Sequence, residues 1–310
     1  MIYQTDGILL IDKAVGETSH SIVKKVRAVF GGLKNKKVGH AGTLDPFATG
    51  LLVILLGQGT KLSSYIMSQN KQYLATMTLG IETDTLDPTG KVLRTTIVPN
   101  LKKDEIRKNI QDFVGDIEQT PPAYSAVKLK GTPAYKMARK GIEAELKKRM
   151  ITISFIRIIS INLPDITMEI GCSKGTYIRS LAADIGRRLG PGGYLKSLRR
   201  LSCGDFGIEQ AVSSKEISET WMFSTGLNRI ISLKEALPFM DEIEIGELLA
   251  EKIKHGYQPV NDELFLGACK KHFKDGHIKL IRNDKLVAVI EVTEGKGGKH
   301  DKLKIARVFL

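Results

Sequence analysis

The pattern of apolar and polar positions in the N-terminal half of the chain predicts short strands with single helices between them. Residues 51–56 form a continuous apolar run and residues 71–80 alternate with period two, which are both strand patterns. Residues 18–32 place their apolar side chains on one helical face, with Thr18 or Ser19 as the cap. A second amphipathic helix is predicted over residues 99–115, capped by Asn100.

The C-terminal half continues with strands and then changes character. Strands are predicted at 150–161 and 165–173, a helix at 175–190 that ends at Gly190, and a strand with a turn at 194–206. Near residues 233–238 the pattern shifts to a short helix at 246–255 followed by β-type runs at 277–292 and 304–310. Helices inserted singly among many strands indicate an α+β fold, and the tail indicates a small β-rich second domain. We therefore expect domains at residues 1–236 and 237–310.

Residues 119–150 interrupt this pattern. The segment begins with Pro121 and Pro122, contains Gly131, Pro133 and Gly141, and has little apolar content. Such a composition predicts a projecting, mobile element rather than a part of the core.

Composition sets the broad class of protein. The 310 residues are 42% apolar and 26% charged, which suits a globular protein with a substantial core. No segment is long and apolar enough to cross a bilayer, and the first residues do not follow the pattern of a secretory signal. We therefore expect a soluble cytoplasmic protein. The cysteines Cys172, Cys203 and Cys269 and the six histidines are dispersed, so we expect neither a metal site nor a disulfide framework.

The positive charge points to a polyanion. Lys and Arg number 47 against 34 Asp and Glu, a net charge of +13. The excess is clustered: six basic residues and no acidic one lie in 24–37, eight against two in 119–150, and five against none in 187–200. A solvated basic surface is the simpler explanation. Clustering with interleaved tyrosines favours nucleic acid, and RNA over DNA because no DNA-binding motif is found.

The loop GHAGTLDPFATG, residues 39–50, holds the strongest candidate for chemistry. Its aspartate, Asp45, is a turn or cap residue, a metal ligand, or a nucleophile or acid–base group. The metal interpretation lacks partners, since only His40 is near. The catalytic interpretation needs a distant cation to hold the carboxylate ionised.

Three other residues fit that catalytic interpretation. Tyr177 and Arg179 lie at a predicted strand-to-helix junction. Arg179 is either an exposed residue at the start of the helix or a bidentate partner of Asp45. Tyr73 is either an ordinary strand aromatic or a platform that stacks on a base. His40 is either a structural histidine or a planar wedge that replaces a base extruded from an RNA stack.

Together these segments resemble a known family. GHAGTLDPFATGLL is similar to the catalytic motif of the pseudouridine synthases, in the branch that modifies tRNA position 55, the TruB branch. GILLIDKAVGETSHSIVKKV, KQYLATMTLGIETDTLDPTG, PPAYSAVKLKGTPAYKMARKG, GTYIRSLAADIGRRLG and LRRLSCGDF resemble further segments of that branch in the right order. The resemblance covers most of residues 7–210. Ala14 departs from it, since proline is usual there.

The resemblance implies a fold and a role for each site residue. It implies a mixed, largely antiparallel central sheet with flanking helices and a small C-terminal PUA-like RNA-binding domain. Residues 119–150 would be a thumb-like, RNA-clasping insertion, called the thumb below. Asp45 would be the catalytic aspartate, Arg179 its partner, His40 the base-flipping histidine and Tyr73 the residue that stacks on uracil. Tyr177 and Leu198 would line the pocket, with Lys61 near its edge.

The implied reaction is the isomerisation of uridine 55 in the T-arm stem-loop of tRNA to pseudouridine. It needs no metal and no cofactor, and we expect a monomer without an obligate protein partner. Two alternatives stay open at this point. One is a guide-RNA-dependent synthase that acts on ribosomal RNA, and the other is a non-catalytic RNA-binding or RNA-folding protein on the same fold.

Overall fold

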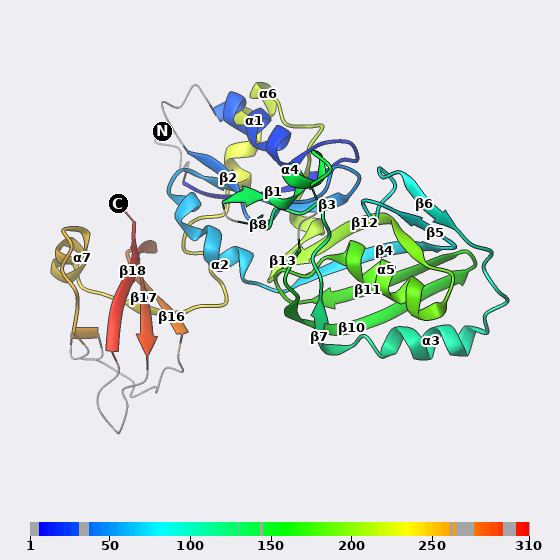
Figure 1. The fold of residues 1–310 in the computed structure, drawn as a ribbon. Coiled ribbons are helices and arrows are strands. Elements are labelled where there is room, and N and C mark those ends of the chain that lie inside the picture. The colour runs from blue at the N-terminus through cyan, green and yellow to red at the C-terminus, as the bar shows by residue number, and fades with distance from the viewer. Residues whose placement is uncertain are drawn as a thin grey trace.

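A large mixed sheet carries most of the fold (Figure 1). The computed structural model describes residues 6–30, 37–129, 131–142, 145–260, 263–264, 276–293 and 302–309. Across the sheet the strands follow in the order β14 (Val212–Ser213), β1 (Gly7–Lys13), β3 (Thr49–Leu56), β12 (Gly193–Cys203), β4 (Lys71–Leu79), β11 (Asp165–Cys172), β10 (Arg149–Asn162) and β7 (Gly115–Gln119). Two short strands, β2 (Val38–His40) and β13 (Phe206–Gly207), pair with β3 and β12. Only β1–β14 and β3–β12 are parallel pairs within it, which confirms the mixed, largely antiparallel sheet.

Helices cover one face of this sheet. The main ones are α1 (Ser19–Phe30), α3 (Lys103–Gln111) and α5 (Ile178–Leu189). Thr18 caps α1, because its Oγ1 accepts a hydrogen bond from the Ser21 amide at 2.9 Å. The predicted cap at Asn100 is wrong: α3 begins at Lys103, with Lys102 at the N-cap position and no side-chain cap.

Two hydrophobic layers explain the apolar strand patterns. Leu9 and Ile11 of β1 pack on the helical face, whereas Ile8 and Leu10 pack on the other face. Because β3 is also covered on both faces, residues 51–56 are apolar without alternation.

A four-stranded C-terminal sheet forms the second unit, as the sequence predicted. It consists of β15 (Asp241–Glu244), β16 (Gly276–Arg282), β17 (Lys285–Thr293) and β18 (Lys302–Val308) in that order. Helix α7 (Glu247–Lys254) packs on one side of this sheet through Ala250 and Ile253. The other side contributes Leu286, Val289 and Phe309 to the layer beneath the large sheet, so the two sheets share a core. The boundary at residue 237 stays a prediction.

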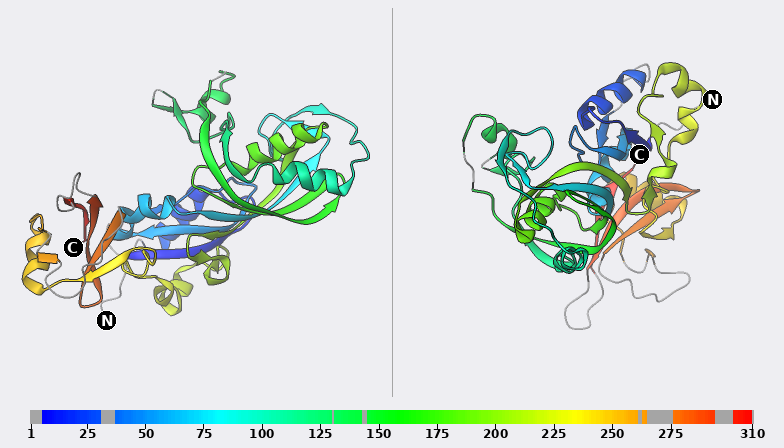
Figure 2. Two further views of the ribbon diagram at one scale, coloured as in Figure 1. Left: turned by 90° about the horizontal axis from the view of Figure 1, so that it is seen from below. Right: turned by 90° about the vertical axis from the view of Figure 1, so that its right-hand side faces the viewer.

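The described part of the thumb projects from the large sheet between β7 and β10 (Figure 2). It contains β8 (Lys128–Leu129), β9 (Thr132–Pro133) and the short helix α4 (Ala134–Ala138). The remaining elements are β5 (Ile81–Thr83), β6 (Val92–Thr95), α2 (Ser63–Met67), α6 (Glu219–Ser224) and three short 3-10 helices, η1 (Gly57–Leu62), η2 (Ile208–Gln210) and η3 (Gly226–Arg229). No helix in the described ranges is long and apolar enough to span a membrane.

Candidate active site

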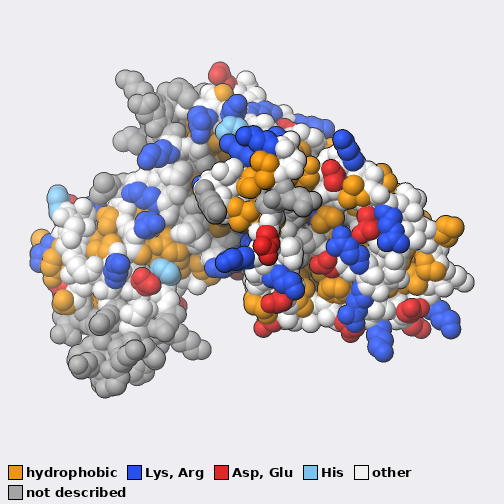
Figure 3. Space-filling model, viewed as in Figure 1, with side chains coloured by type: hydrophobic (Ala, Val, Ile, Leu, Met, Phe, Trp, Pro, Cys, Tyr) orange, Lys and Arg blue, Asp and Glu red, His pale blue; other side chains and the backbone are white. Residues whose placement is uncertain are grey.

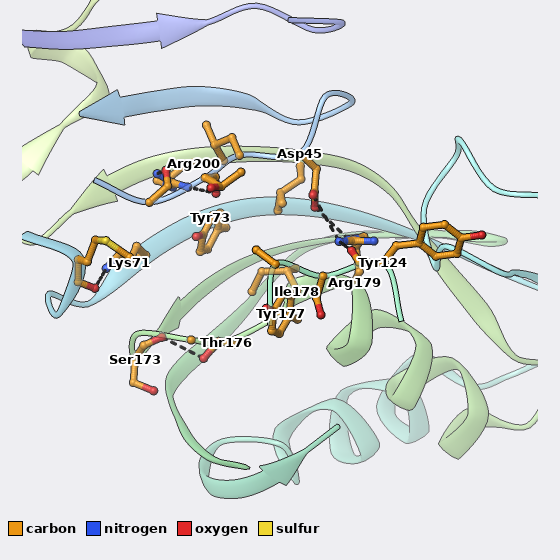
Figure 4. A pocket seen from close by; sticks show the side chains of 18 residues that line it. Asp45, Lys71, Tyr73, Tyr124, Ser173, Thr176, Tyr177, Ile178, Arg179 and Arg200 are labelled. Atoms are coloured by element: carbon orange, nitrogen blue, oxygen red, sulfur yellow. Dashed lines mark hydrogen bonds and ion pairs between the residues drawn. The ribbon is translucent and has the colours of Figure 1, made fainter. Parts of the chain in front are cut away.

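An ion pair between Asp45 and Arg179 joins two segments that lie far apart in the sequence (Figure 4). Arg179 Nε lies 2.9 Å from Asp45 Oδ2, and Nη2 donates to Asp45 Oδ1 at 3.3 Å. The Arg179 side chain is 5% exposed, whereas that of Asp45 is 34% exposed. The guanidinium therefore contacts both carboxylate oxygens and leaves part of the carboxylate open to a ligand.

The position of Arg179 is set by three further contacts. Its Nη1 donates to the Thr85 carbonyl at 2.9 Å and lies 3.3 Å from Asp87 Oδ2. Its Nη2 donates to the Tyr124 carbonyl at 2.9 Å. Because the guanidinium is buried and both of its terminal nitrogens are hydrogen-bonded, it presents a fixed charge to Asp45 rather than a mobile one.

The loop that carries Asp45 is bound to the protein at several points. Ser19 Oγ accepts from the Leu44 amide at 2.9 Å and contacts the Leu44 carbonyl at 3.1 Å. Arg200 donates to the carbonyls of Gly42, Thr43 and Leu51 at 2.9–3.2 Å. Gly42 has φ +101°, a conformation that residues with a Cβ rarely adopt. The protein's own contacts thus fix the shape of the loop.

The register of the central strands brings the base-binding candidates under this loop. β12 lies between β3 and β4, with Arg200 opposite both Gly50 and Tyr73 and with Leu198 opposite Ala75. A Cβ at Gly50 would lie 2.3 Å from the Arg200 carbonyl oxygen, so only glycine allows the two strands to approach here. The Arg200 guanidinium carbon lies 5.8 Å from the centre of the Tyr73 ring.

These residues border a cavity of about 280 Å³. Its lining includes all of the following predicted residues: Asp45, Tyr73, Tyr177, Arg179 and Leu198. The cavity lies just below the size range of about 300–1,000 Å³ that is typical for drug-sized ligands, so it suits a single small ring system. One charged edge and an aromatic and aliphatic lining fit a planar base that carries polar groups on its rim.

The environment of Asp45 shifts its ionisation. Burial raises the pKa of Asp45 above its ordinary value, the Arg179 charge opposes that rise, and the nearby Asp87 adds to it. Burial also raises the pKa of Tyr73, so its hydroxyl stays protonated at neutral pH. Burial therefore disfavours the charged form of Asp45, and the buried Arg179 favours it.

Comparison with known proteins decides the family. A family model described as the N-terminal domain of TruB family pseudouridylate synthases matches residues 31–178, and one described as the tRNA pseudouridylate synthase B C-terminal domain matches residues 179–242. A tRNA pseudouridine synthase B from Geobacter sulfurreducens is 38% identical over 98% of this chain and 99% of its own length. The chain belongs to the TruB family of pseudouridylate synthases. It is therefore a pseudouridine synthase, an isomerase.

A second TruB-family relative agrees with this assignment, and one solved structure shares the fold. A tRNA pseudouridine synthase B from Clostridium kluyveri is 45% identical, over 86% of this chain and 89% of that protein. A chain in the crystal structure of a Cbf5–Nop10–Gar1 complex superposes with a TM-score of 0.75 and covers 99% of this chain and 85% of its own length. Its sequence identity is 22%, so that likeness concerns the fold alone.

In this TruB-family protein, His40 lies apart from the predicted site residues that line the cavity. It ends β2 opposite Ile54, five residues before Asp45, and it does not line the cavity. Burial and the neighbouring Arg200 lower the pKa of His40, so the ring is neutral at pH 7. Within the described residues its Nδ1 is buried without a hydrogen-bond partner. The role of His40 as a wedge stays a prediction.

Lys61 lies elsewhere. It is in η1, where its Nζ donates to the Val308 carbonyl at 2.7 Å and lies 5.4 Å from the centre of the Phe309 ring. Lys61 was expected near the edge of the pocket, but it is not among the residues that line the cavity. Its ammonium group joins η1 to strand β18 of the C-terminal sheet.

Several residues of this TruB site were not predicted from the sequence. Asp87 holds Arg179, while Arg200, Lys71 and Tyr124 line the cavity. Arg200 was counted only as a member of a basic cluster, although it is 2% exposed. The turn TDTLDPTG, with three threonines around Asp87, is a signal in the sequence that could have pointed to Asp87. Within the described ranges, no group of three or more His, Cys, Asp or Glu side chains is placed to hold a metal ion.

Proposed function

We propose that this pseudouridine synthase acts on tRNA and isomerises uridine 55 in the T-arm stem-loop. The relatives that match nearly all or most of the chain carry the name tRNA pseudouridine synthase B. The observation that carries the proposal is the carboxylate of Asp45, held by the buried Arg179 at the rim of a base-sized cavity.

The cavity is sunk into the protein, so the target base has to leave its stack to reach Asp45. Flipping a nucleotide out costs roughly a few kcal/mol, and this cost falls when another planar group fills the gap. His40 is suited to that task, because its ring is neutral and lies beside the loop that carries Asp45. The flipped uracil then packs between Tyr73 and Leu198 with its sugar next to Asp45.

Ionised Asp45 then drives the cleavage of the N-glycosidic bond. Three steps suit its carboxylate: attack at C1′ of the sugar, attack at C6 of the uracil, or removal of the proton at C2′. In each of them N1 separates from C1′, the uracil turns within the cavity and C5 bonds to C1′. The C5 proton then leaves, N1 takes up a proton, and Asp45 releases whatever bond it formed or returns the proton that it took from C2′. No oxidant, reductant or metal is required for this balance. Water exclusion by the bound RNA strengthens the effect of Arg179 on the carboxylate.

The surface supports a polyanionic substrate. Lys and Arg side chains gather along the edge of the molecule that carries α1 and the thumb helix α4 (Figure 3). We infer that the RNA lies along this edge, that the thumb clasps it, and that the PUA-like C-terminal sheet adds contacts to it. The chain acts as a monomer without an obligate protein partner in this proposal, and it acts in the cytoplasm.

Tritium release tests the proposal. Transcribed tRNA labelled with 5-³H-uridine releases tritium when C5 of the target loses its proton, and a transcript with cytidine at position 55 serves as the substrate control. We expect release from the first transcript only. Asp45→Asn should lower the rate by at least about 10³-fold, whereas Asp104→Asn, on the exposed surface of α3, should leave it unchanged.

Two results would replace the proposal. Release from ribosomal RNA in the presence of a guide RNA, with none from tRNA, would favour a guide-dependent synthase. Tight tRNA binding without any release would favour an RNA-binding or RNA-folding protein.

A further inference from the structure

The two ends of the thumb both contact Tyr177, a residue of the active site. Gln119, the last residue of β7, and Arg149, the first residue of β10, are Cα partners at the root of the thumb. Both contact Tyr177, which lines the cavity two residues before Arg179.

The contact of Gln119 with Tyr177 involves both ends of a side-chain amide. Gln119 Nε2 donates to the Tyr177 carbonyl at 3.0 Å, and Gln119 Oε1 accepts from the Tyr177 amide at 2.8 Å. Gln119 is 1% exposed. A buried primary amide that satisfies both groups of one backbone residue fixes the position and the orientation of that residue.

The contact lies where helix α5 begins. Tyr177 is the N-cap residue of α5, and its side chain makes no capping hydrogen bond. Arg149 contacts its ring instead, with the guanidinium carbon 5.1 Å from the ring centre. The start of α5 is therefore held by the root of the thumb rather than by a cap of its own.

Two more hydrogen bonds join the start of α5 to the thumb. Ser180 Oγ donates to the Thr120 carbonyl at 2.9 Å, and Arg179 Nη2 donates to the Tyr124 carbonyl at 2.9 Å. Residues 177, 179 and 180 are thus bonded in turn to residues 119, 124 and 120 of the thumb. The segment that carries Arg179 and the segment that leads into the thumb form one hydrogen-bonded unit.

We propose that Gln119 is a positioning residue, which sets Arg179 against Asp45 and couples that pair to the thumb. This inference rests on the proposed function, because it assigns Gln119 to the reaction at Asp45. Gln119 touches neither Asp45 nor the cavity. It acts through Tyr177, two residues from an arginine whose bonds to the carboxylate are 2.9–3.3 Å long. A displacement of about 1 Å at such a site lowers a rate by as much as about 10²-fold.

The experiment uses Gln119→Leu, which removes both hydrogen bonds, and Gln119→Asn, which keeps the amide but shortens its reach by one methylene. Gln111→Leu is the matched control, because Gln111 Nε2 also bonds a backbone carbonyl, that of Ile156 at 2.8 Å, away from the cavity. Three quantities are measured for the full-length protein: the Kd for tRNA, the single-turnover rate of tritium release at saturating tRNA, and the pH dependence of that rate.

We expect Gln119→Leu to lower the single-turnover rate about 10–100-fold with a Kd for tRNA within about threefold of wild type. The acid limb of the rate profile should move to higher pH, because Arg179 lowers the pKa of Asp45 and a misplaced Arg179 does so less. Gln119→Asn should show the same changes to a smaller degree, and it decides the question if the leucine variant does not fold. Gln111→Leu should change neither rate nor profile.

A loss of tRNA affinity with an unchanged saturating rate would overturn the inference, since Gln119 would then serve RNA binding alone. An unshifted acid limb together with a lower melting temperature would also overturn it, in favour of a purely structural role. An inactive wild-type protein would count against the proposed function itself. Active wild type with unaffected Gln119 variants would count against this inference only.

Discussion

Arg179 contacts Asp45 and Asp87 with the same guanidinium, at 2.9 Å and 3.3 Å respectively. Asp87 is 6% exposed, and its Oδ1 accepts hydrogen bonds from Thr85, from the Thr89 amide and from the Thr89 hydroxyl. Asp87 is therefore a fixed second anion on the far side of the arginine. One cation shared by two carboxylates sets both the place and the ionisation of Asp45.

Replacing Asp87 with asparagine separates these two effects. Asp45 acts as an anion, so the rate falls as the pH drops through its pKa. Burial and the charge of Asp87 raise that pKa, so the loss of the Asp87 charge lowers it and moves the acid limb of the tritium-release profile to lower pH. The plateau rate should fall by no more than about tenfold, because Arg179 keeps its bonds to the Thr85 and Tyr124 carbonyls and stays in place against Asp45. Asp116→Asn, at an exposed position of β7, is the control. An acid limb that stays in place or moves to higher pH would contradict this electrostatic account.

Arg200→Lys tests whether the catalytic loop is built by the protein rather than by RNA. A lysine cannot reach all three of the carbonyls of Gly42, Thr43 and Leu51. The bond to the Leu51 carbonyl is buried, and a buried carbonyl left unpaired costs about 1–3 kcal/mol. We expect the free energy of unfolding in urea to fall by about 1–3 kcal/mol, with a matching loss of activity.

The neighbouring Arg199 provides the matched control. Its side chain is 37% exposed and forms a two-point pair with Asp12 at 2.7 and 3.0 Å. Arg199→Lys should therefore cost less than about 1 kcal/mol. Equal losses in the two variants would show that burial of Arg200 beneath the loop is not what matters.

His40→Ala tests the wedge. If the ring only replaces the flipped base, the variant should bind tRNA with nearly wild-type Kd and turn it over more slowly, by about 10-fold or more, since the few kcal/mol needed for flipping are no longer offset. Glu105→Ala, at an exposed position of α3, should leave both quantities unchanged. A His40→Ala protein that fails to fold in circular dichroism would instead make His40 a structural residue.

Sequence patterns were sufficient for the elements but not for all of the site. Strands β3, β4 and β10 and helices α1 and α5 follow from period and capping, because these signals are local. The pair of Asp45 and Arg179 was also accessible, because an aspartate in a glycine-rich loop needs a cation to act as a catalyst.

The buried charges could not be found in this way, since their partners are set by tertiary structure. Arg200 and Lys13 look like surface cations in the sequence, yet they are 2% and 0% exposed. Both donate hydrogen bonds to backbone carbonyls. Arg200 donates to three carbonyls in residues 42–51, and Lys13 donates to that of Pro46 among others. Gln119 gave no signal at all, because a glutamine that bonds one backbone residue 58 positions away has no local pattern.

The thumb should account for part of the electrostatic binding of tRNA. Lys136, Arg139 and Lys140 are exposed in and after α4, which projects from the sheet beside the site (Figure 2). Each phosphate contact that is lost should reduce the slope of log affinity against log salt by about 0.7–0.9, so the triple glutamine variant should lower it by about 2–3. The equivalent change at Lys102, Lys103 and Lys108, exposed in and just before α3 and well away from α4 (Figure 1), alters the net charge equally. If binding depends on where the charges lie, only the thumb variant should change the slope. Equal slopes for both variants would mean that the RNA responds to net charge alone and that the thumb makes no direct phosphate contacts.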